Sequence, residues 1–337
     1  MKRSISIITS LLLSISTIAI ILFLTVDRSS IERLREVKIQ WFILAVLLHF
    51  LSWVIWGLRI SVMSGHLDRE RKINLRESME ITLANLFLAA ITPSMAGGEP
   101  VRIHLISKKG FGIGRGTALV LGERVFDGIF VLSLVPLSLI VFSTYIHEEV
   151  IKLGLLLGLI LFLVGISIFV YSVLRPDSVS RLIKSIIKKI KLKRLERNLE
   201  SLFEKVDGFV DAFHKGARDI FKRENKVGIL IIALLTASFW FIEFLIPSCI
   251  LLGLDQDPII IQSISAQILL LIIVMIPLTP GSSGVAEGCS AILYSAIIPD
   301  RSVLGIMILA WRFITYHLNI IVGGIFQYKL IGSLSRR

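Results

Sequence analysis

Long runs of apolar residues dominate the chain, separated by short polar segments. Runs of roughly 20 apolar residues, the length that crosses a bilayer core as a helix, lie near residues 5–26, 39–63, 116–145, 151–174, 227–254 and 303–330. They predict six transmembrane helices. Two further apolar stretches, at about 79–111 and 259–298, are interrupted near their middles by Pro and Gly. These predict helical hairpins that either span the membrane or re-enter from one side.

The pattern predicts an all-α polytopic membrane protein with six to eight transmembrane helices in a single domain, residues 1–337. Composition agrees, because 54% of the residues are apolar and the mean hydropathy is +0.81, more than one soluble core would hide. The run at 5–26 is too long for a signal peptide and has no small-residue cleavage site before Asp27, so we expect a transmembrane helix there. Cys249 and Cys289 lie in apolar surroundings without metal-type spacing, which favours buried hydrophobic roles.

The distribution of positive charge predicts how the chain is oriented in the cell membrane. With the N-terminus placed inside, 28 of the 37 Lys and Arg residues fall on the cytoplasmic side and six on the opposite side. The other three, Arg59, Arg124 and Arg312, fall within spans. Because cytoplasmic loops carry an excess of Lys and Arg, we expect both termini to be cytoplasmic. The net charge of +12 then belongs to the inner membrane surface, and we expect no nucleic-acid partner.

One polar segment, residues 175–226, is long enough to form structure outside the bilayer. It carries 15 Lys and Arg against eight Asp and Glu. Apolar residues recur at helical spacing in both of its halves, from Leu182 to Ile190 and from Leu195 to Phe213. This pattern predicts a basic amphipathic helical hairpin that lies against the anionic inner leaflet.

A short motif occurs twice, once in each interrupted apolar stretch. The two copies are TPSMAGGE at residues 92–99 and TPGSSGVAE at residues 279–287, and each has Thr-Pro, a Gly four residues after the Pro, and then a Glu. The Glu of each copy is followed 25 residues later by an Arg within a helix, Arg124 in the first case and Arg312 in the second. Two matches with the same Glu-to-Arg separation indicate an internal duplication.

The charge-based orientation predicts that the two copies are inverted. The helix before the first motif would run from outside to inside, and the helix before the second from inside to outside. We therefore expect inverted repeats at about 39–145 and 227–331, a plan that recurs in membrane transporters with broken helices. Pro ends a helix and Gly permits a sharp reversal, so the hairpins should turn at Pro93, Gly97, Gly98, Pro280, Gly281 and Gly284.

Ionisable residues within the apolar segments are candidates for function, because each costs about 3 kcal/mol on insertion scales. The set comprises Glu99, Arg102, Glu123, Arg124, Asp127, Glu287 and Arg312. In one interpretation the arginines bind a phosphate, while Glu99 and Glu287 contact a cationic or hydroxylated headgroup or carry a coupling proton. In the other, Glu and Arg only neutralise each other and lock the hairpins in place. Recurrence of the set in both halves favours the first interpretation.

Other polar residues in the spans carry weaker signals. Trp53 and Trp56 are typical of interfacial anchors, and we expect Arg59, near the cytoplasmic end of its helix, to extend its charged group to the interface. Glu243 lies in the middle of a span with no evident partner in the sequence. No histidine has companion ligands at metal-binding spacing, so we expect neither a metal nor another cofactor.

The two motif regions, TPSMAGGEPVR with GERVFD and TPGSSGVAEG with AWRF, resemble the flippase-like transmembrane domain of lysylphosphatidylglycerol synthases, which also occurs as stand-alone UPF0104-type membrane proteins. The resemblance covers nearly the whole chain and implies translocation of a lipid or lipid-linked group. We expect no synthase domain, since only seven residues follow Leu330. The family residues carried over are Pro93, Gly97, Gly98, Glu99, Arg102, Glu123, Arg124, Asp127, Pro280, Gly284, Glu287 and Arg312.

The leading hypothesis is a lipid translocase whose polar cavity admits the headgroup of an anionic phospholipid or a polyprenyl phosphate while the tails stay in the bilayer. A membrane enzyme that acts on a lipid phosphate or glycolipid, with Glu99 or Glu287 as general base, is the alternative, but the sequence offers no catalytic motif for it. A scaffold that recruits partners through the basic segment is a third hypothesis. A homo-oligomer and a separate synthase partner are both compatible with the sequence.

Overall fold

The computed structural model describes residues 36–92, 97–142, 199–274, 279 and 281–334, together with scattered helical positions between 153 and 185. No strand occurs among these residues, and the prediction of an all-α membrane protein is confirmed. Helices long and apolar enough to cross a membrane are α3 (Ile39–Leu67), α6 (Gly112–Phe142), α10 (Lys226–Gly253) and the continuous run of α13 (Arg301–Arg312), the π-helical η4 (Phe313–His317) and α14 (Leu318–Leu334).

These four helical segments coincide with four of the six predicted spans. The predicted span at 5–26 lies outside the described residues, and the one at 151–174 lies mostly outside them. The shorter helices are α4 (Leu75–Ala90), α5 (Gly98–Ile106), the π-helical η1 (Ser107–Phe111), α9 (Leu199–Ile220), the 3-10 helix η3 (Arg223–Asn225), α11 (Ile260–Val274) and α12 (Val285–Ser295).

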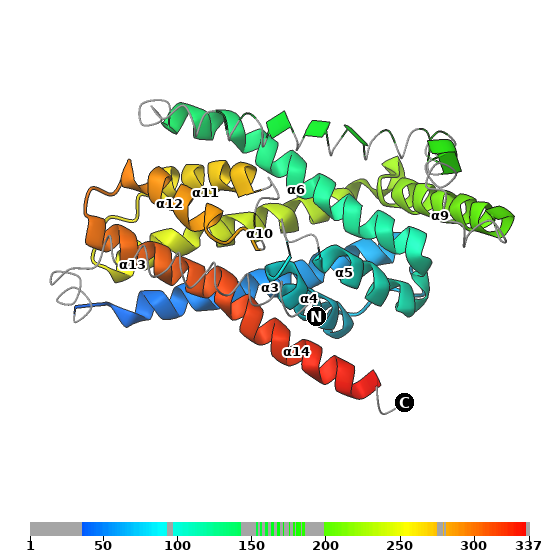
Figure 1. Cartoon of the computed structure of the whole chain (residues 1–337), viewed down its shortest axis with the longest axis horizontal. Helices are drawn as coiled ribbons and strands as arrows, with labels where there is room; N and C mark the ends of the chain where they lie inside the picture. The colour runs from blue at the N-terminus through cyan, green and yellow to red at the C-terminus, as the bar shows by residue number, and fades with distance from the viewer. Residues whose placement is uncertain are drawn as a thin grey trace.

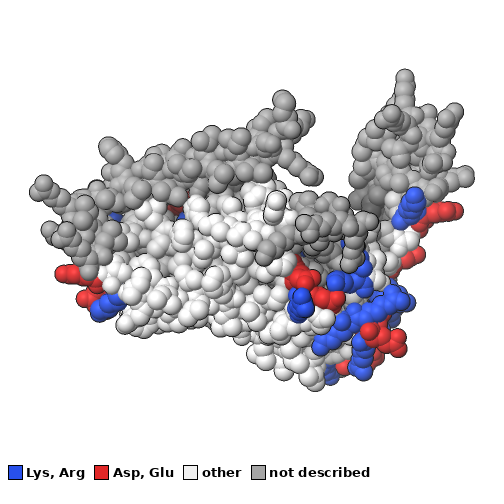
Figure 2. Space-filling model, turned by 90° about the horizontal axis from the view of Figure 1, so that it is seen from below, with Lys and Arg blue, Asp and Glu red and all other residues white. Residues whose placement is uncertain are grey.

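The helices form an elongated bundle with two chemically different ends (Figure 1). At one end, here called the basic end, α3 finishes and α4, α6 and α10 begin. At the opposite end α3 begins beside the end of α10, where Lys38 N–H donates to the carbonyl of Gly253 at 2.9 Å and Lys38 Nζ pairs with Asp255 at 2.6 Å. Figure 2 shows a wide uncharged belt between the ends, with Lys and Arg gathered at the basic end. By the positive-inside rule this end is expected to be cytoplasmic.

Helices α4 and α5 form a hairpin that enters and leaves at the basic end. A capping box begins α4, in which Asn74 Oδ1 accepts from the N–H of Glu77 at 2.9 Å. Lys109, just after α5, returns to Glu77 and donates to it at 2.6 Å. Gly110 and Gly112, with φ of 93° and 71°, then turn the chain into α6. The 16 residues of α4 span about 24 Å, less than the roughly 30 Å hydrocarbon core, so this hairpin is re-entrant.

Helices α11 and α12 form the second hairpin, which enters from the opposite end. Its arms are held together near their outer ends by Tyr294, whose hydroxyl lies 2.9 Å from Ser263 Oγ and accepts from Gln267 Nε2 at 3.1 Å. Near the tip Ser282 Oγ donates to the carbonyl of Val274 at 3.3 Å. The arms therefore run antiparallel, and with 15 and 11 residues neither reaches across the core.

The two hairpins meet tip to tip inside the bundle. The N–H of Gly281 donates to the carbonyl of Thr92 at 2.9 Å, and the hydroxyl of Tyr316 donates to the carbonyl of Ala90 at 3.2 Å. Each hairpin is also covered by a long helix of the other half, since α14 packs along α4 and α6 packs along α11. Gln327 marks the first of these contacts by donating to the carbonyl of Ala84 at 2.8 Å.

Helix α9 differs from the expectation for the polar segment 175–226. Its apolar face, with Val210, Phe213 and Ala217 buried, packs on α6. The fit is close, because a Cβ added at Gly114 would lie 2.7 Å from the Cβ of Ala212. The sequence therefore predicted an amphipathic helix correctly here. An amphipathic pattern does not say which apolar surface the helix will cover.

Candidate functional site

The middle of α6 carries three charged residues inside the apolar belt. Glu123, Arg124 and Asp127 lie 11 to 15 residues from the start of this 31-residue helix, which is about 17–23 Å along its axis. The re-entrant α5 brings Glu99 and Arg102 alongside them. This placement follows from the antiparallel packing of α5 on α6, in which Glu99 and Arg102 occupy positions one turn apart on one face of α5.

Ion pairs connect these five residues and Arg59 of α3 into one group, here called the α5–α6 ion cluster. Arg102 pairs with Glu123 and, at 3.2 Å, with Glu99. Arg124 pairs with Glu99 at 2.9 Å and with Asp127 at 3.0 Å. Arg59 completes the cluster through Asp127 at 2.7 Å and Glu123 at 3.5 Å. Three guanidinium groups thus face three carboxylates, so the cluster is neutral if all six are ionised.

Aromatic residues form one wall of the cluster. The guanidinium carbons of Arg102 and Arg124 lie 5.0 and 5.7 Å from the ring centroid of Trp56, distances that give cation–π attraction. Trp240 Nε1 donates to Asp127 at 3.0 Å, and Arg59 lies 5.6 Å from the ring of Phe239. These rings keep a group of six charged side chains in place within an otherwise apolar bundle.

Two sequence-based expectations for α3 are wrong. Arg59 does not reach toward the interface, since it is 1% exposed and ion-paired in the α5–α6 ion cluster. Trp56 does not act only as an interfacial anchor, because its ring lies against Arg102 and Arg124. The helical spacing of Trp56 and Arg59 was visible in the sequence, but nothing in α3 itself identified the carboxylates of α6 as their partners.

Exposure divides the α5–α6 ion cluster into a core and an edge. The side chains of Arg59, Arg102 and Glu123 are at most 1% exposed, and that of Asp127 is 8% exposed. Arg124 is 39% exposed and Glu99 27% exposed. Arg124 and Glu99 are therefore the charged groups of the cluster that a ligand can reach without the bundle being taken apart.

The second motif forms a smaller and more enclosed site, here called the tip pair. Arg312 donates to Glu287 at 2.7 Å, and their side chains are 4% and 0% exposed. The second Glu287 oxygen accepts from the N–H of Gly284 at 2.7 Å, which caps α12. Arg312 also donates to the carbonyl of Gly281 at 3.3 Å and lies 4.1 Å from the ring of Tyr316. Both charged groups of the tip pair are thus engaged by each other and by the backbone of the hairpin tip.

The structure does not bring the seven predicted charged residues into a single cluster. Five belong to the α5–α6 ion cluster, and Glu287 and Arg312 form the tip pair. Of the predicted turn residues, Gly281 and Gly284 have φ of 58° and 84° in the second tip. Gly98 is required for close packing, since a Cβ there would lie 1.9 Å from Asn85 Oδ1, and the N–H of Gly97 donates to Thr92 Oγ1 at 2.8 Å. Pro93 and Pro280 lie outside the described residues.

A third polar group, missed by the sequence reasoning, joins α3, α10 and α14. Glu243 Oε1 lies 2.8 Å from His49 Nδ1 and accepts from Ser52 Oγ. His49 Nε2 lies 3.1 Å from Asn319 Oδ1. His49 is buried. Glu243 therefore has the partner that the sequence did not reveal. Such a contact between residues 194 positions apart cannot be deduced from local pattern.

The fold and these sites define a class of protein: a polytopic α-helical membrane protein with two re-entrant hairpins that enter from opposite ends and carry buried Arg–carboxylate groups. The chain matches the lysylphosphatidylglycerol synthase TM region over residues 7–323 and belongs to that family.

Curated relatives cover almost the full chain. A UPF0104 membrane protein of Archaeoglobus fulgidus is 34% identical over 96% of this chain and 97% of the relative. A UPF0104 membrane protein of Pyrococcus horikoshii is 22% identical over 95% of this chain and 96% of the relative. No solved structure matches the chain. The resemblance and the membrane location expected from the sequence are confirmed.

Proposed function

We propose that this protein moves a phospholipid or a lipid-linked headgroup between the leaflets of the membrane. The observation that carries the proposal is the partly exposed edge of the α5–α6 ion cluster at the level of the apolar belt. The tip pair, by contrast, is almost fully enclosed, and a ligand could reach it only by separating a buried ion pair, which is strongly destabilising. Arg124 and Glu99 instead remain reachable.

The chemistry of the edge suits an anionic headgroup. A guanidinium binds phosphate with two parallel hydrogen bonds and stays charged in an apolar environment. A phosphate that approached Arg124 would compete with Glu99, and Glu99 would then be released toward a cationic or hydroxylated part of the same headgroup. The buried Nε–H groups of Arg59 and Arg102 make no hydrogen bond among the described residues. These two donors are therefore available to form new bonds when a headgroup displaces Glu99.

The hairpins supply a physical reason for a path across the bilayer. Each one replaces part of a full-length span with helix ends that lie inside the membrane, and such ends are tolerated only where protein or a polar cavity surrounds them. Broken helices that enter from both sides and meet inside the membrane are the arrangement used by transporters with inverted repeats. We infer that the halves at about 39–145 and 227–331 are such repeats and that the headgroup passes along their contact.

A liposome assay tests the proposal. The purified protein is reconstituted with a fluorescently labelled anionic phospholipid, and a membrane-impermeant quencher reports the labelled lipid left in the outer leaflet over time. Wild-type protein is expected to expose nearly all of the label, whereas protein-free liposomes expose about half. Arg124→Ala is expected to slow exposure by about tenfold, the loss of one charge-assisted contact.

The matched control is Arg76→Ala, which removes an arginine whose side chain is 91% exposed and which lies outside both charged groups. It should leave translocation at the wild-type rate. Translocation at the wild-type rate in Arg124→Ala would overturn the role given to Arg124. Mass spectrometry of the recovered lipid separates translocation from the enzyme hypothesis, which requires a chemically altered lipid.

A further inference from the structure

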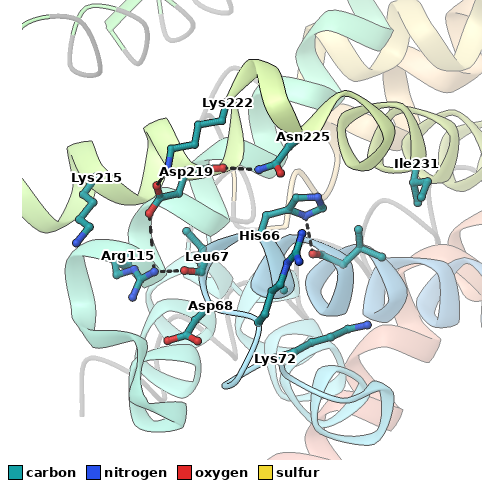
Figure 3. Close-up of a pocket in the computed structure, with 13 residues that line it drawn as sticks. His66, Leu67, Asp68, Lys72, Arg115, Lys215, Asp219, Lys222, Asn225 and Ile231 are labelled. Carbon is teal, nitrogen blue, oxygen red and sulfur yellow. Dashed lines mark hydrogen bonds and ion pairs between the residues drawn. The ribbon is translucent and has the colours of Figure 1, made fainter.

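A pocket of about 890 Å³ lies at the basic end, away from the charged groups described above. Figure 3 shows its walls, which come from the end of α3, the loop before α4, the start of α6, the end of α9 and the start of α10. It shares no residue with the α5–α6 ion cluster or the tip pair. We refer to it as the basic-end pocket.

Cationic side chains outnumber carboxylates in the basic-end pocket by five to two. Arg115 and Lys222 both lie near Asp219, at 3.9 and 2.7 Å, and Asn225 donates to the Asp219 backbone carbonyl at 2.8 Å. These bonds fix the wall formed by α6, α9 and η3. They leave three further cations, from two separate segments of the chain, at the same opening.

The three further cations are Arg69, Lys72 and Lys215. None of them has an ion pair with a carboxylate in the part of the chain that the structure describes. Arg69 and Lys72 come from the loop between α3 and α4, and Lys215 comes from α9. Like charges from separate elements repel one another, so an anion bound between them would relieve this repulsion and hold the loop and α9 together.

The start of α10 adds a further attraction for an anion. Its N-cap residue, Asn225, makes no side-chain capping bond, and the Asn225 amide donates to the backbone carbonyl of Asp219. A helix N-terminus carries partial positive charge, and this one belongs to a 28-residue helix. The anionic part of a ligand therefore has both side-chain charges and a helix end available to it.

The rest of the pocket favours a lipid over a free anion. Val62 and Ile231 give it an apolar wall. On α10 this wall continues into an exposed apolar face, with Val227 72%, Leu230 58% and Leu234 59% exposed. Since α10 is long and apolar enough to cross a membrane, this face meets acyl chains. One ligand that uses both surfaces is a phospholipid with its phosphate among the cations and its tails along α10.

We propose that the basic-end pocket binds the headgroup of an anionic phospholipid from the adjacent leaflet, as a resident lipid distinct from any transported one. The bound lipid bridges the α3–α4 loop and α9 through Arg69, Lys72 and Lys215, and it braces the base of the α4–α5 hairpin. This assignment does not depend on the proposed translocation.

Binding to delipidated full-length protein in a neutral detergent tests the proposal. Phosphatidylglycerol is titrated and followed by native mass spectrometry, with phosphatidylcholine as the uncharged-headgroup comparison. The triple variant Arg69→Gln/Lys72→Gln/Lys215→Gln is expected to lose at least about tenfold in affinity for phosphatidylglycerol, given the contribution of each cation near a membrane surface. The matched control Arg76→Gln/Lys108→Gln/Lys205→Gln removes the same charge from exposed positions outside the pocket and should bind as wild type does.

Two further measurements keep the test decisive. The variant Lys72→Arg/Lys215→Arg preserves charge and should retain binding, so that a loss in the triple variant is assigned to the missing charges. Glycerol phosphate and inorganic phosphate are offered as competitors. Equal weakening in the triple variant and its control, or no preference for phosphatidylglycerol over phosphatidylcholine, overturns the site. Displacement of the lipid by inorganic phosphate at equal concentration overturns the assignment to a lipid.

Discussion

The two hairpins carry similar sequence motifs but differ in how their charges are enclosed. At the α11–α12 hairpin, Glu287 of α12 and Arg312 of α13 are almost fully buried, and they bond to each other and to the backbone of the hairpin tip. At the α4–α5 hairpin, Glu99 of α5 and Arg124 of α6 remain partly exposed and belong to a cluster of six charged groups. The same Glu-to-Arg spacing of 25 residues therefore supports two different physical situations.

This difference separates a structural role from a binding role. A buried pair in which both carboxylate oxygens accept a hydrogen bond is difficult to open, because release of either partner leaves a charge in an apolar environment. A partly exposed pair loses less when a competing ion replaces one partner. We therefore expect the tip pair to control stability and the edge of the α5–α6 ion cluster to control function.

The largest effect is expected from breaking the tip pair. Glu287→Gln leaves the buried Arg312 guanidinium without its counter-charge, and the free energy of unfolding should fall by about 3–5 kcal/mol. Thermal unfolding of the detergent-purified protein, followed by tryptophan fluorescence, would show this as a large drop in Tm. A variant that unfolds within a degree of the wild type would contradict the proposed enclosure.

The double variant Glu287→Leu/Arg312→Leu is the control for this experiment. It removes both charges together, so no unpaired ion remains, and it should be more stable than Glu287→Gln. Glu287 also accepts from the N–H of Gly284. If the double variant is as unstable as the single one, the loss of stability comes from this missing backbone bond rather than from an unpaired buried charge.

The next largest effect concerns the contact between the hairpin tips. Gly281 has φ of 58°, and a Cβ there would lie 2.1 Å from the carbonyl oxygen of Ala90 in the other hairpin. Gly281→Ala should therefore cost at least about 2 kcal/mol through strain and displacement of the neighbouring tip. Gly288→Ala is the matched control, because it lies in the same hairpin with nothing within 4 Å of the added Cβ. Equal Tm values for the two variants would show that the tips do not depend on this contact.

A smaller effect on stability is expected at the exposed edge. Arg124→Ala removes pairs to Glu99 and Asp127, but because Arg124 is 39% exposed and Arg59 still pairs with Asp127, the loss should be about 1 kcal/mol. In the liposome assay the same variant should be slowed far more than Gly281→Ala at a temperature where both are folded. A loss of stability as large as that of Glu287→Gln would remove the distinction between edge and tip pair.

The sequence predicted much of this architecture because its signals are local. Apolar runs gave four of the described spans, and Pro and Gly within two of them indicated hairpins. The repeated pattern and the ionisable residues of the apolar segments identified both residues of the tip pair and five of the six residues of the α5–α6 ion cluster. What the sequence lacked was the partner of each charge: Arg59 and Glu243 lie on helices whose own patterns say nothing about α6 or His49.

The separation of the two charged groups was also not predictable. The expectation of a single cavity treated the motifs as equivalent, whereas their enclosure depends on which helices pack beside them. Arg124 lies on α6 beside the short α5, while Arg312 lies beneath the tip of α12 with Tyr316 against it. Packing of this kind brings together residues that are far apart in the chain. It cannot be predicted from a periodic pattern, which indicates only that one face of a helix is apolar.

The smallest effect concerns the bases of the two hairpins. An ion pair holds one base, and hydrogen bonds between uncharged groups hold the other. The bond from Lys109 lowers the pKa of Glu77 at the base of the α4–α5 hairpin, whereas neutral hydrogen bonds of Tyr294 hold the α11–α12 hairpin. A carboxyl group whose pKa is lowered by folding stabilises the protein above its unfolded pKa of about 4.3, and this contribution is lost as the pH falls through the folded value. Lys109→Ala should thus cost about 0.5 kcal/mol at pH 7 and nothing near pH 3. Tyr294→Phe should lower Tm by the same amount at both pH values, and a pH-independent effect of Lys109→Ala would show that Glu77 gains nothing from its partner.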